Sequence, residues 1–370
     1  GVAGTVVENF GVGSSVTISE NRITIDPTAD LSAGGDYIIS YPSGCFTNNE
    51  GSDYVGTAYT FQARGYSYQL WAWGGNGHGQ LAQNNRTSRS SPVQIPGTTW
   101  DFVNQGSGGR NGACVAIKSD NTLWIWGENG YGSLGLNDTV HRSSPTQIPG
   151  TWSSASSGGN AATNHFHNGA INTDGELYLW GRNTHGGLGQ NNEISYSSPV
   201  QVPGTTWKYH ISTLNRSVIA SKTDGTLWGW GQSADGNTGL GNNTDYSSPV
   251  QIGSLTTWTG TVDTLSGGYF NTMAIRTDGT LWVWGNNQWG QLAQNNTNGT
   301  ANNSPVQIPG TTWSKVANTF YGGLATKTDG TLWSWGYGSQ GQLGNNNRTA
   351  RSSPIQIPGT TWDKISSMRL

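Results

Sequence analysis

The sequence Asp278-Gly279-Thr280-Leu281-Trp282-Val283-Trp284-Gly285 decides the fold of this chain, because related sequence occurs six times. Asp-Gly is a tight-turn dipeptide, in which Asp hydrogen-bonds its own backbone and Gly tolerates a positive φ angle. Leu-Trp-x-Trp then alternates large and variable side chains with a period of two, which is typical of a strand with one buried face. The other copies are Gln69–Gly74, Asp120–Gly127, Asp174–Gly181, Asp224–Gly231 and Asp329–Gly336.

The spacing of the copies is nearly constant. Their second Trp residues are Trp73, Trp126, Trp180, Trp230, Trp284 and Trp335, and the steps between them are 53, 54, 50, 54 and 51 residues. A period near fifty indicates a repeat protein in which one supersecondary unit packs on the next. Each unit also contains a Thr-Trp strand, a strand before the Asp-Gly turn and a Ser-Pro-Val-Gln-Ile strand. Four short antiparallel strands without helical periodicity predict a β-propeller blade.

Composition limits the classes of partner. Only 11% of the residues are charged and the net charge is −3, so nothing indicates binding to nucleic acid or to an anionic membrane. The 18 Trp residues fall almost entirely at repeat positions, which predicts an aromatic core. No run of eighteen apolar residues exists, so we expect no membrane insertion. Cys45 and Cys114 lie in different predicted domains, and we expect each to be a lone buried thiol.

Residues 1–62 lie outside the repeats. Ser15–Ile18, Arg22–Ile25 and Asp36–Ser40 are predicted strands. With Leu31–Tyr37 before a strand and Thr57–Phe61 at its end, the segment resembles the second half of a bacterial Ig-like domain, as found in surface-layer and phage structural proteins. The alternative is a β-hairpin cap on the first repeat. Since the chain begins with Gly and not Met, we expect it to be a processed or partial product.

Residues 63–370 resemble a known propeller family. Asp329–Gly336, followed by Gly341-Gln342-Leu343-Gly344, is similar to the repeat of the regulator of chromosome condensation family, as is Trp126-Gly127 with Gly132–Gly135. The resemblance implies an all-β propeller preceded by a small β-sandwich-like segment. It implies little about activity, because the family includes exchange factors, enzyme inhibitors and adhesive modules.

The two ends of the repeat region predict how the ring closes. The first unit has no Thr-Trp strand, whereas the chain ends with Trp362–Ser366, a Thr-Trp strand that no unit follows. We therefore expect six blades, with the C-terminal strand completing the first. Seven blades, the usual number in the family, would require sequence beyond Leu370.

No pattern indicates catalysis. The repeated Asp174, Asp224, Asp278 and Asp329 are explained by their turns, so we expect no metal. His165 and His167 have no third ligand nearby and are expected in a surface loop. Catalytic triads, paired acidic motifs and phosphate loops are absent from the sequence. We expect a protein that is not an enzyme and needs no cofactor.

Two positions vary between repeats, and they predict a binding face. The first precedes Gly-x-Leu and the second precedes the strand before the Asp-Gly turn. Both lie in loops that leave an up-and-down blade on the same side, away from the Asp-Gly turns. Their residues include types enriched in binding hot spots, although loops that nothing constrains would also vary. The predicted ligand-binding residues are Tyr131, His185, Trp289, Phe166, Arg216, Phe270 and Tyr321.

The favoured hypothesis is a non-enzymatic binding or structural module of a virion appendage or a bacterial surface, located on the virion or outside the cell. It would attach through the variable loops to a host-surface glycan or protein, or to other virion or surface proteins, and it is compatible with a homo-oligomer in a fibre. The alternative is a propeller-type protein inhibitor or interaction scaffold. A nucleotide-exchange role ranks third, because it would call for a basic tail.

Overall fold

The computed structural model describes strands β1–β4 as backbone, and residues 69–105, 112–160, 165–212, 216–269, 271–297, 299–319 and 321–365. Within these ranges, side chains are described except at residues 105, 159, 160, 165, 166 and 212. The chain divides into two compact units, residues 1–67 and 68–370. The sequence-based boundary was placed between residues 62 and 63.

The first unit contains two antiparallel hairpins. β1 (Val16–Ser19) pairs with β2 (Arg22–Ile25), and β3 (Asp36–Ile39) pairs with β4 (Tyr59–Gln62). The three strands predicted here coincide with β1, β2 and β3. A sandwich of the Ig-like kind is not seen among the described strands, so that resemblance stays a prediction.

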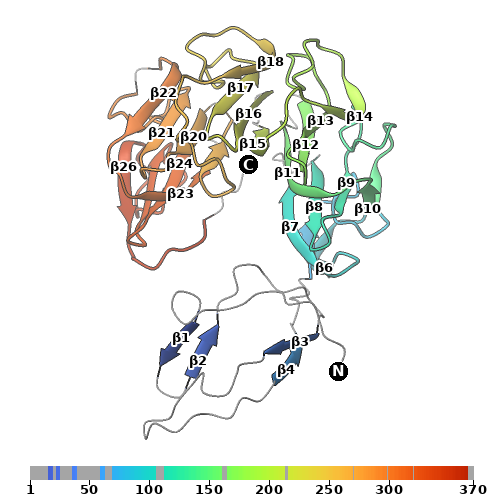
Figure 1. Cartoon of the computed structure of the whole chain (residues 1–370). Coiled ribbons are helices and arrows are strands. Elements are labelled where there is room, and N and C mark those ends of the chain that lie inside the picture. Colours follow the sequence, from blue (N-terminus) through green and yellow to red (C-terminus); the bar gives the residue numbers. More distant parts are fainter. Residues whose placement is uncertain are drawn as a thin grey trace, which may run out of the picture. The chain divides into compact units, whose positions relative to one another are not determined.

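The second unit consists of four-stranded antiparallel sheets arranged like a fan (Figure 1). We call them blades 2 to 6, and the two-stranded sheet of β5 (Trp71–Gly74) and β6 (Arg89–Gln94) blade 1. Blade 2 comprises β7 (Trp100–Gln105), β8 (Ala113–Lys118), β9 (Leu123–Gly127) and β10 (Arg142–Ile148); blade 3 comprises β11 (Trp152–Asn160), β12 (His165–Asn172), β13 (Leu177–Gly181) and β14 (Tyr196–Gln201). Blade 4 comprises β15 (Trp207–Ser212), β16 (Ser217–Lys222), β17 (Leu227–Gly231) and β18 (Tyr246–Gln251). Blade 5 comprises β19 (Leu265–Gly267), β20 (Asn271–Ile275), β21 (Leu281–Gly285) and β22 (Asn302–Ile308); blade 6 comprises β23 (Trp313–Asn318), β24 (Gly322–Lys327), β25 (Leu332–Gly336) and β26 (Arg351–Ile357).

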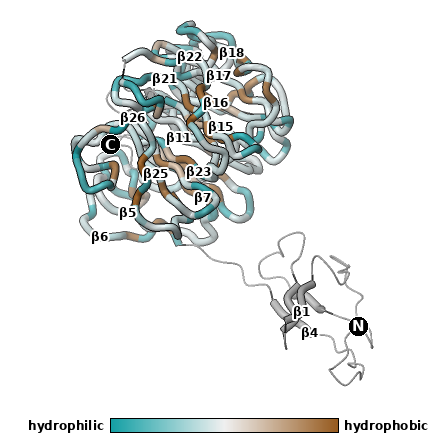
Figure 2. The backbone as a smooth tube through the Cα atoms, turned by 90° about the vertical axis from the view of Figure 1, so that its left-hand side faces the viewer, coloured by the Kyte–Doolittle hydropathy of each residue, from teal (hydrophilic) through white to brown (hydrophobic). Residues whose placement is uncertain are grey.

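The strand order within each blade runs outward from a common centre. The first strands of neighbouring blades contact each other, from β7 through β11, β15 and β19 to β23. The fourth strands are half-buried, as expected at the outer rim. Hydrophobic segments run through the interiors of the blades (Figure 2), and no helix occurs among the described residues. The predicted all-β propeller with six repeated units is therefore confirmed over this part of the chain.

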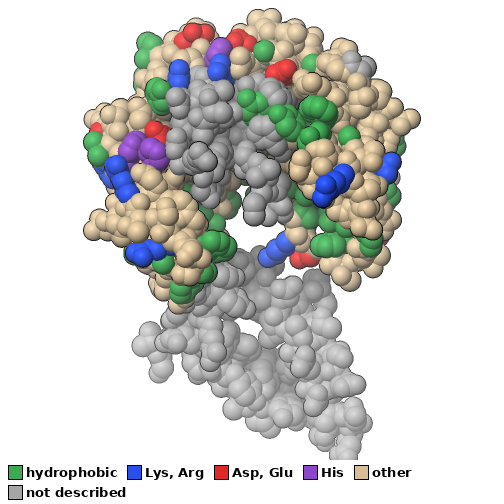
Figure 3. Space-filling model, turned by 180° about the vertical axis from the view of Figure 1, so that it is seen from behind, with side chains coloured by type: hydrophobic (Ala, Val, Ile, Leu, Met, Phe, Trp, Pro, Cys, Tyr) green, Lys and Arg blue, Asp and Glu red, His purple; other side chains and the backbone are tan. Residues whose placement is uncertain are grey.

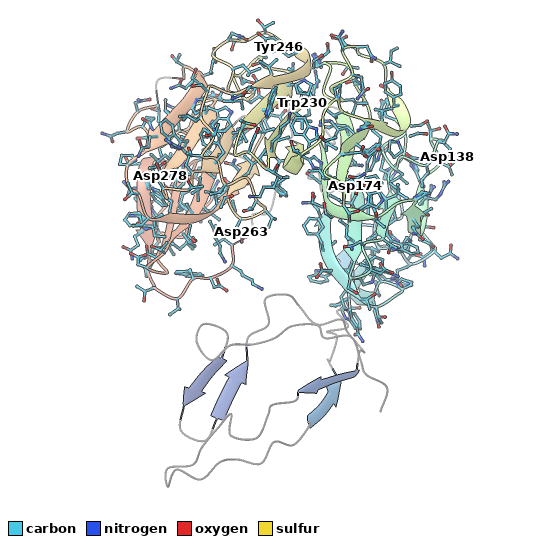
Figure 4. All side chains as sticks on the ribbon, viewed as in Figure 1. Asp138, Asp174, Trp230, Tyr246, Asp263 and Asp278 are labelled. Carbon is cyan, nitrogen blue, oxygen red and sulfur yellow. The ribbon has the colours of Figure 1, made fainter. Side chains whose placement is uncertain are left out.

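The repeated Asp-Gly-Thr-Leu-Trp sequence forms a relay of hydrogen bonds. The Asp278 Oδ1 accepts the backbone N–H of Thr280 at 3.0 Å and its hydroxyl at 2.6 Å. The Thr280 hydroxyl oxygen in turn accepts the indole N–H of Trp282 at 2.9 Å. These hydrogen bonds, led by the one from the Thr280 side chain, hold the pKa of Asp278 below its usual value. Asp278 is labelled in Figure 4. The carboxylate is thus occupied by its own turn, as the sequence predicted.

In three blades, a lysine two positions before the Asp of this turn packs on two indole rings. The Lys327 ammonium lies 4.8 Å from the ring centroid of Trp313 and 4.4 Å from that of Trp333, both in the same blade. Lys118 and Lys222 make the equivalent pairs of contacts. Such cation–π contacts each contribute about 0.5–1 kcal/mol at exposed sites. They help to hold the first and third strands of a blade together.

The second Trp of each motif joins one blade to the next. Its indole N–H donates to a backbone carbonyl in the loop of the preceding blade, and its side chain is almost fully buried. The five bonds are Trp126 to Gln80 (2.8 Å), Trp180 to Ser133 (2.8 Å), Trp230 to Gly187 (2.9 Å), Trp284 to Asn237 (2.9 Å) and Trp335 to Gln291 (2.9 Å). Trp230 is labelled inside its blade in Figure 4. An equivalent Trp side chain therefore makes the same hydrogen bond at each of these five boundaries.

The sixth boundary differs from the other five. Trp73, the equivalent residue of blade 1, is 63% exposed, whereas Trp126 is 1% exposed. Gly341 of blade 6 has nothing within 4 Å of an added Cβ atom, although its counterpart Gly290 would meet Ser352 at 2.8 Å. At the other five boundaries the equivalent surfaces contact the neighbouring blade. Among the described residues, nothing covers these surfaces of blade 1 and blade 6.

The predicted closing strand is not formed in the described residues. Residues 362–365 belong to no strand, and Trp362 is 41% exposed. Its backbone N–H nevertheless donates to the Gly330 carbonyl at 3.1 Å, just as Trp313 donates to Gly279 at 3.0 Å. Trp362 therefore makes the backbone contact that Trp313 makes at the start of β23, although no strand follows it in the described residues. Residues 366–370 lie outside the described residues, and closure by this segment stays a prediction.

Candidate binding face

The two variable positions lie on one face of the propeller. We define the loop face as the loops that join the first strand to the second and the third to the fourth in each blade. The third-to-fourth loop of one blade contacts the first-to-second loop of the next: His185 touches Arg216, and Trp289 touches Tyr321. The structure thus brings together the predicted residues of each of these two pairs. Figure 3 shows one face of the unit, on which charged and histidine side chains lie in small groups among uncharged ones.

A buried Asn fixes the backbone of most third-to-fourth loops. The Asn183 side-chain N–H₂ donates to the carbonyls of Asn192 (2.9 Å) and Ile194 (3.0 Å), and its Oδ1 accepts the Leu188 N–H at 2.8 Å. The same type of bonding occurs at Asn76, Asn129 and Asn287. Each buried amide is thus satisfied by the loop that it holds. The variable side chains consequently stand on a backbone that the buried Asn holds in place.

An aromatic cluster spans the boundary between blades 5 and 6. The ring centroid of Trp289 lies 6.2 Å from that of Tyr321 and 4.8 Å from that of Tyr337, and the two Tyr centroids are 5.9 Å apart. All three side chains are half-buried. The interplanar angles, 57° to 73°, are typical of edge-to-face packing. The cluster presents a nonpolar surface with hydroxyl and indole N–H groups at its edges.

Tyr337 is a member that sequence reasoning missed. It directly follows the Trp-Gly that ends β25, a position that is also variable: its counterparts include Glu128, Arg182 and Asn286. Two of these contact the loop of the preceding blade: the Arg182 guanidinium lies 4.6 Å from the Tyr131 ring centroid, and Asn286 donates to Asp235 at 3.4 Å. Variation at this third position was the signal that could have identified it.

A polar cluster spans the boundary between blades 3 and 4. The His185 Nδ1 lies 2.9 Å from Asp245 Oδ2, and its Nε2 lies 2.6 Å from a terminal nitrogen of Arg216. Since a guanidinium can only donate, His185 accepts at Nε2 and donates from Nδ1 to the carboxylate. Asp245 is itself held by the backbone N–H of Ser233 at 2.8 Å. The His185 ring is therefore held in one orientation between the Arg216 guanidinium and the Asp245 carboxylate.

Four of the residues singled out from the sequence remain to be placed. Phe166 was predicted in a loop, but the structure places it in β12, because the β11–β12 hairpin continues to the Asn160–His165 pair. The predicted surface position of His167 is wrong: it pairs with Gly181, as the buried Ser217 pairs with Gly231, so it is 2% exposed and burial lowers its pKa to about 4. Phe270 lies outside the described residues, as does the side chain of Phe166. Tyr131 is 39% exposed and lies against Arg182.

The described residues contain no group of three His, Cys, Asp or Glu side chains that could hold a metal ion. In the same part of the chain, no helix is long and apolar enough to cross a membrane. Cys114 is buried, as predicted, and burial raises the pKa of its thiol to about 12. Cys45 lies outside the described residues.

The Regulator of chromosome condensation (RCC1) repeat matches residues 120–162, 174–212, 224–275, 278–323 and 329–368, and a second RCC1 repeat pattern matches residues 262–291. The chain therefore belongs to the RCC1 repeat family. The resemblance seen in the sequence is confirmed for these repeats.

Two plant proteins are similar to this chain. The Ultraviolet-B receptor UVR8 of Arabidopsis thaliana is 28% identical over 296 residues, which cover 75% of this chain and 62% of the receptor. The mitochondrial RCC1 domain-containing protein RUG3 of the same plant is 28% identical over 284 residues, which cover 74% of this chain and 51% of that protein. The chain thus spans less than two thirds of either relative.

Solved structures show the same fold. Yeast RCC1 (Prp20) bound to Kap60 superposes with a TM-score of 0.65 at 17% identity, covering 81% of this chain and 73% of that one. Human WBSCR16 also has a TM-score of 0.65 at 17% identity, covering 90% and 97% of the two chains. At this identity the likeness concerns the propeller architecture alone.

Proposed function

We propose that this chain is a non-enzymatic binding module that recognises a protein partner through the loop face. The contacting residues would be those of the aromatic cluster and the polar cluster, together with Tyr131 and Arg182. Proteins with RCC1-type propellers include one in a complex with Kap60, which agrees with a protein partner for this chain. The capture experiment described below would identify that partner.

The observation that carries the proposal is the aromatic cluster of Trp289, Tyr321 and Tyr337 on a fixed loop backbone. Trp and Tyr dominate binding hot spots because they offer large contact areas at a small cost in side-chain entropy. Asn287 already fixes the loop that carries Trp289, so little backbone ordering remains to be paid on binding. The Asp-Gly turns on the opposite face repeat one sequence and offer no comparable variety.

We further propose that the chain is displayed on a virion appendage or on the surface of a bacterial cell. This proposal rests on the resemblance of residues 1–62 to a bacterial Ig-like domain and on the low content of charge and cysteine. In that setting the partner would be a host-surface protein or glycan, or a neighbouring virion or surface protein. Aromatic rings with polar edges also suit sugar rings, which makes a glycan the second candidate ligand.

The test compares how much partner is recovered by variants that are altered on one face of the propeller or on the other. Immobilised wild-type chain, the Trp289→Ala/Tyr337→Ala variant and a control Thr205→Ala/Thr311→Ala variant are exposed to the same host envelope extract. Proteins and glycans retained are quantified, and the affinity of the purified partner is then measured. We expect loss in the first variant only. Equal retention by all three proteins would exclude the loop face, and loss only in the threonine variant would place the site on the opposite face.

A further inference from the structure

A small cavity lies at the polar cluster, between blades 3 and 4. Its volume is about 10 Å³, and its lining includes His167, Arg182, His185 and Arg216. Such a space holds one oxygen-sized group. Arginine and lysine together make up only 18 of the 370 residues, so the meeting of two guanidiniums at one cavity is unusual in this chain.

Two buried nitrogens of this lining lack a partner among the described residues. They are His167 Nε2 and Arg216 Nε. A buried polar atom without a hydrogen bond costs about 1–3 kcal/mol, so such atoms in a native protein call for an occupant. Neither nitrogen is satisfied by the contact between Arg216 and His185, which uses a terminal guanidinium nitrogen and the other histidine.

The backbone at Arg216 is fixed in an uncommon conformation. Its φ angle is +66°, in the left-handed region that a non-glycine residue rarely adopts. Two glycines make room for its carbonyl oxygen: an added Cβ would lie 2.4 Å from that oxygen at Gly231 and 3.0 Å from it at Gly187. The Gln232 N–H donates to the same oxygen at 3.2 Å. Arg216 is thereby positioned before any ligand arrives.

The charges at the cavity favour an anion. Burial and then the neighbouring Arg182 guanidinium lower the pKa of Arg216, whereas Tyr269 and Asp245 act in the opposite direction. Asp245 directs its carboxylate oxygens to His185 and to the Ser233 N–H. An anionic oxygen between the two guanidiniums would relieve their mutual repulsion and accept from Arg216 Nε.

The neutral ring of His167 narrows the choice of anion. Burial keeps this histidine uncharged near pH 7, while a hydrogen bond to the main chain of Ser217 acts in the opposite direction on its pKa. Because only Nε2 lacks a partner, Nδ1 donates to the Ser217 carbonyl and Nε2 is an acceptor. A carboxylate can only accept, so it does not fit this nitrogen. A protonated phosphate group offers an O–H donor as well as acceptor oxygens for the guanidiniums, so it fits.

We propose that the cavity lined by Arg182, Arg216 and His167 binds a phosphate group, with one oxygen inside and the others at the mouth. The proposal adds a ligand chemistry to the proposed binding face. It does not depend on the partner, since phosphate itself is the probe. Free phosphate and a phosphorylated side chain share this chemistry, and the experiment separates them.

The experiment titrates the full chain with sodium phosphate and, separately, with phosphoserine, against sodium chloride and sodium acetate at matched ionic strength. Thermal stability and the imidazole NMR signals of His167 are followed. We expect saturable stabilisation by phosphate, at least tenfold weaker binding in Arg216→Gln and Arg182→Gln, and unchanged binding in the control Arg348→Gln. A tighter fit of phosphoserine would indicate a phosphorylated partner, and equal or weaker binding would indicate the free ion.

Several results would overturn the proposal. These are equal stabilisation by chloride or acetate, equal binding by the control and cavity variants, or no change at His167 while phosphate binds. If an Arg216→Gln chain fails to fold, Arg182→Gln and the His167 signals still decide the matter. If the wild-type chain captures a partner but shows no saturable phosphate binding, this inference alone is refuted and the proposed function stands.

Discussion

The indole N–H of Trp284 donates to the backbone carbonyl of Asn237, 2.9 Å away, and so joins blade 5 to blade 4. Close approach at this point requires glycine: an added Cβ at Gly239 would lie 2.9 Å from the same indole nitrogen, and Gly239 has a φ angle of +76°. The large side chain and the glycine that faces it belong to different repeats. Each boundary is therefore formed by two repeats, one supplying the Trp side chain and the other the loop with the glycine. This is expected for a chain whose units bury their cores against neighbours.

Trp284→Phe should lower the free energy of unfolding by about 0.5–1.5 kcal/mol, because it removes the indole donor and leaves the buried Asn237 carbonyl with the Thr272 hydroxyl at 3.3 Å alone. Trp284→Ala should cost about 3–5 kcal/mol, since it also leaves a cavity. Urea unfolding measures both values. Trp289→Phe, on the loop face, serves as the control and should change stability by less than about 0.5 kcal/mol. A Phe variant at position 284 as stable as the wild type would show that the bond contributes little.

The sixth boundary gives a test of ring closure. If the propeller closes as the sequence predicted, Trp73 is buried against blade 6 and donates to the Gln342 carbonyl, by analogy with the other five boundaries. Trp73→Ala should then destabilise the protein by about 3–5 kcal/mol, like Trp284→Ala. An effect below about 0.5 kcal/mol would agree with the 63% exposure of Trp73 and refute closure.

Removal of residues 362–370 tests the segment assigned to closure. Trp362 already makes the backbone contact that begins a first strand, so its loss should leave blade 1 with an unpaired inner edge. We expect a clearly lower melting temperature and a greater tendency to aggregate, measured by calorimetry and light scattering. A truncated chain that melts like the full one would assign closure to other sequence.

Much of this architecture could be predicted, because the Asp-Gly-Thr-Leu-Trp relay is local in sequence. Strand period, turn type and the structural role of Asp278 all follow from residues that are adjacent in the chain. The loop face was predicted only in part. Tyr337 meets Trp289 from the next repeat, a contact between units that the sequence of a single repeat does not show. His167 is buried because it pairs with Gly181 at the repeat position where Ser217 pairs with Gly231, and a His-x-His pair considered alone does not show that register.

Two buried histidines should make the protein sensitive to acid. Burial lowers the pKa of His167 to about 4 and that of His210 to about 3, whereas the unfolded chain takes up these protons near pH 6.5. Their contribution to stability is therefore complete above pH 6.5 and is lost as the pH falls toward 4 and below. The His167 shift alone corresponds to about 3 kcal/mol.

Replacing His210 by Asn should flatten the dependence of unfolding free energy on pH between 6.5 and 4, whatever the effect of the substitution at neutral pH. Chemical denaturation at several pH values measures this slope. The half-buried His78, replaced in the same way, is the control. An unchanged slope in the His210 variant would show that this ring does not remain neutral in the folded protein.

Chelation should leave stability unchanged, because the Asp120, Asp224, Asp278 and Asp329 carboxylates accept hydrogen bonds from the Thr residues of their own turns. Calorimetry before and after exhaustive dialysis against EDTA checks this. A fall of many degrees, reversed by one particular divalent ion, would mean that these carboxylates or the His165–His167 segment bind metal after all.

The aromatic cluster should provide most of the binding energy of the loop face. Trp289 and Tyr337 are 4.8 Å apart between centroids and come from neighbouring blades, so a ligand that covers both is held by a rigid, nonpolar centre. Truncating either side chain to Ala should weaken binding of the purified partner by about 2 kcal/mol, roughly thirtyfold. Because the two rings contact each other, the double variant should lose less than the sum of the single losses. Titration calorimetry measures these affinities, and a Tyr337→Phe variant separates the contribution of the ring from that of its hydroxyl. If Tyr337→Phe weakens binding as much as Tyr337→Ala does, the binding energy comes from a hydrogen bond of the hydroxyl, which would contradict a nonpolar contact.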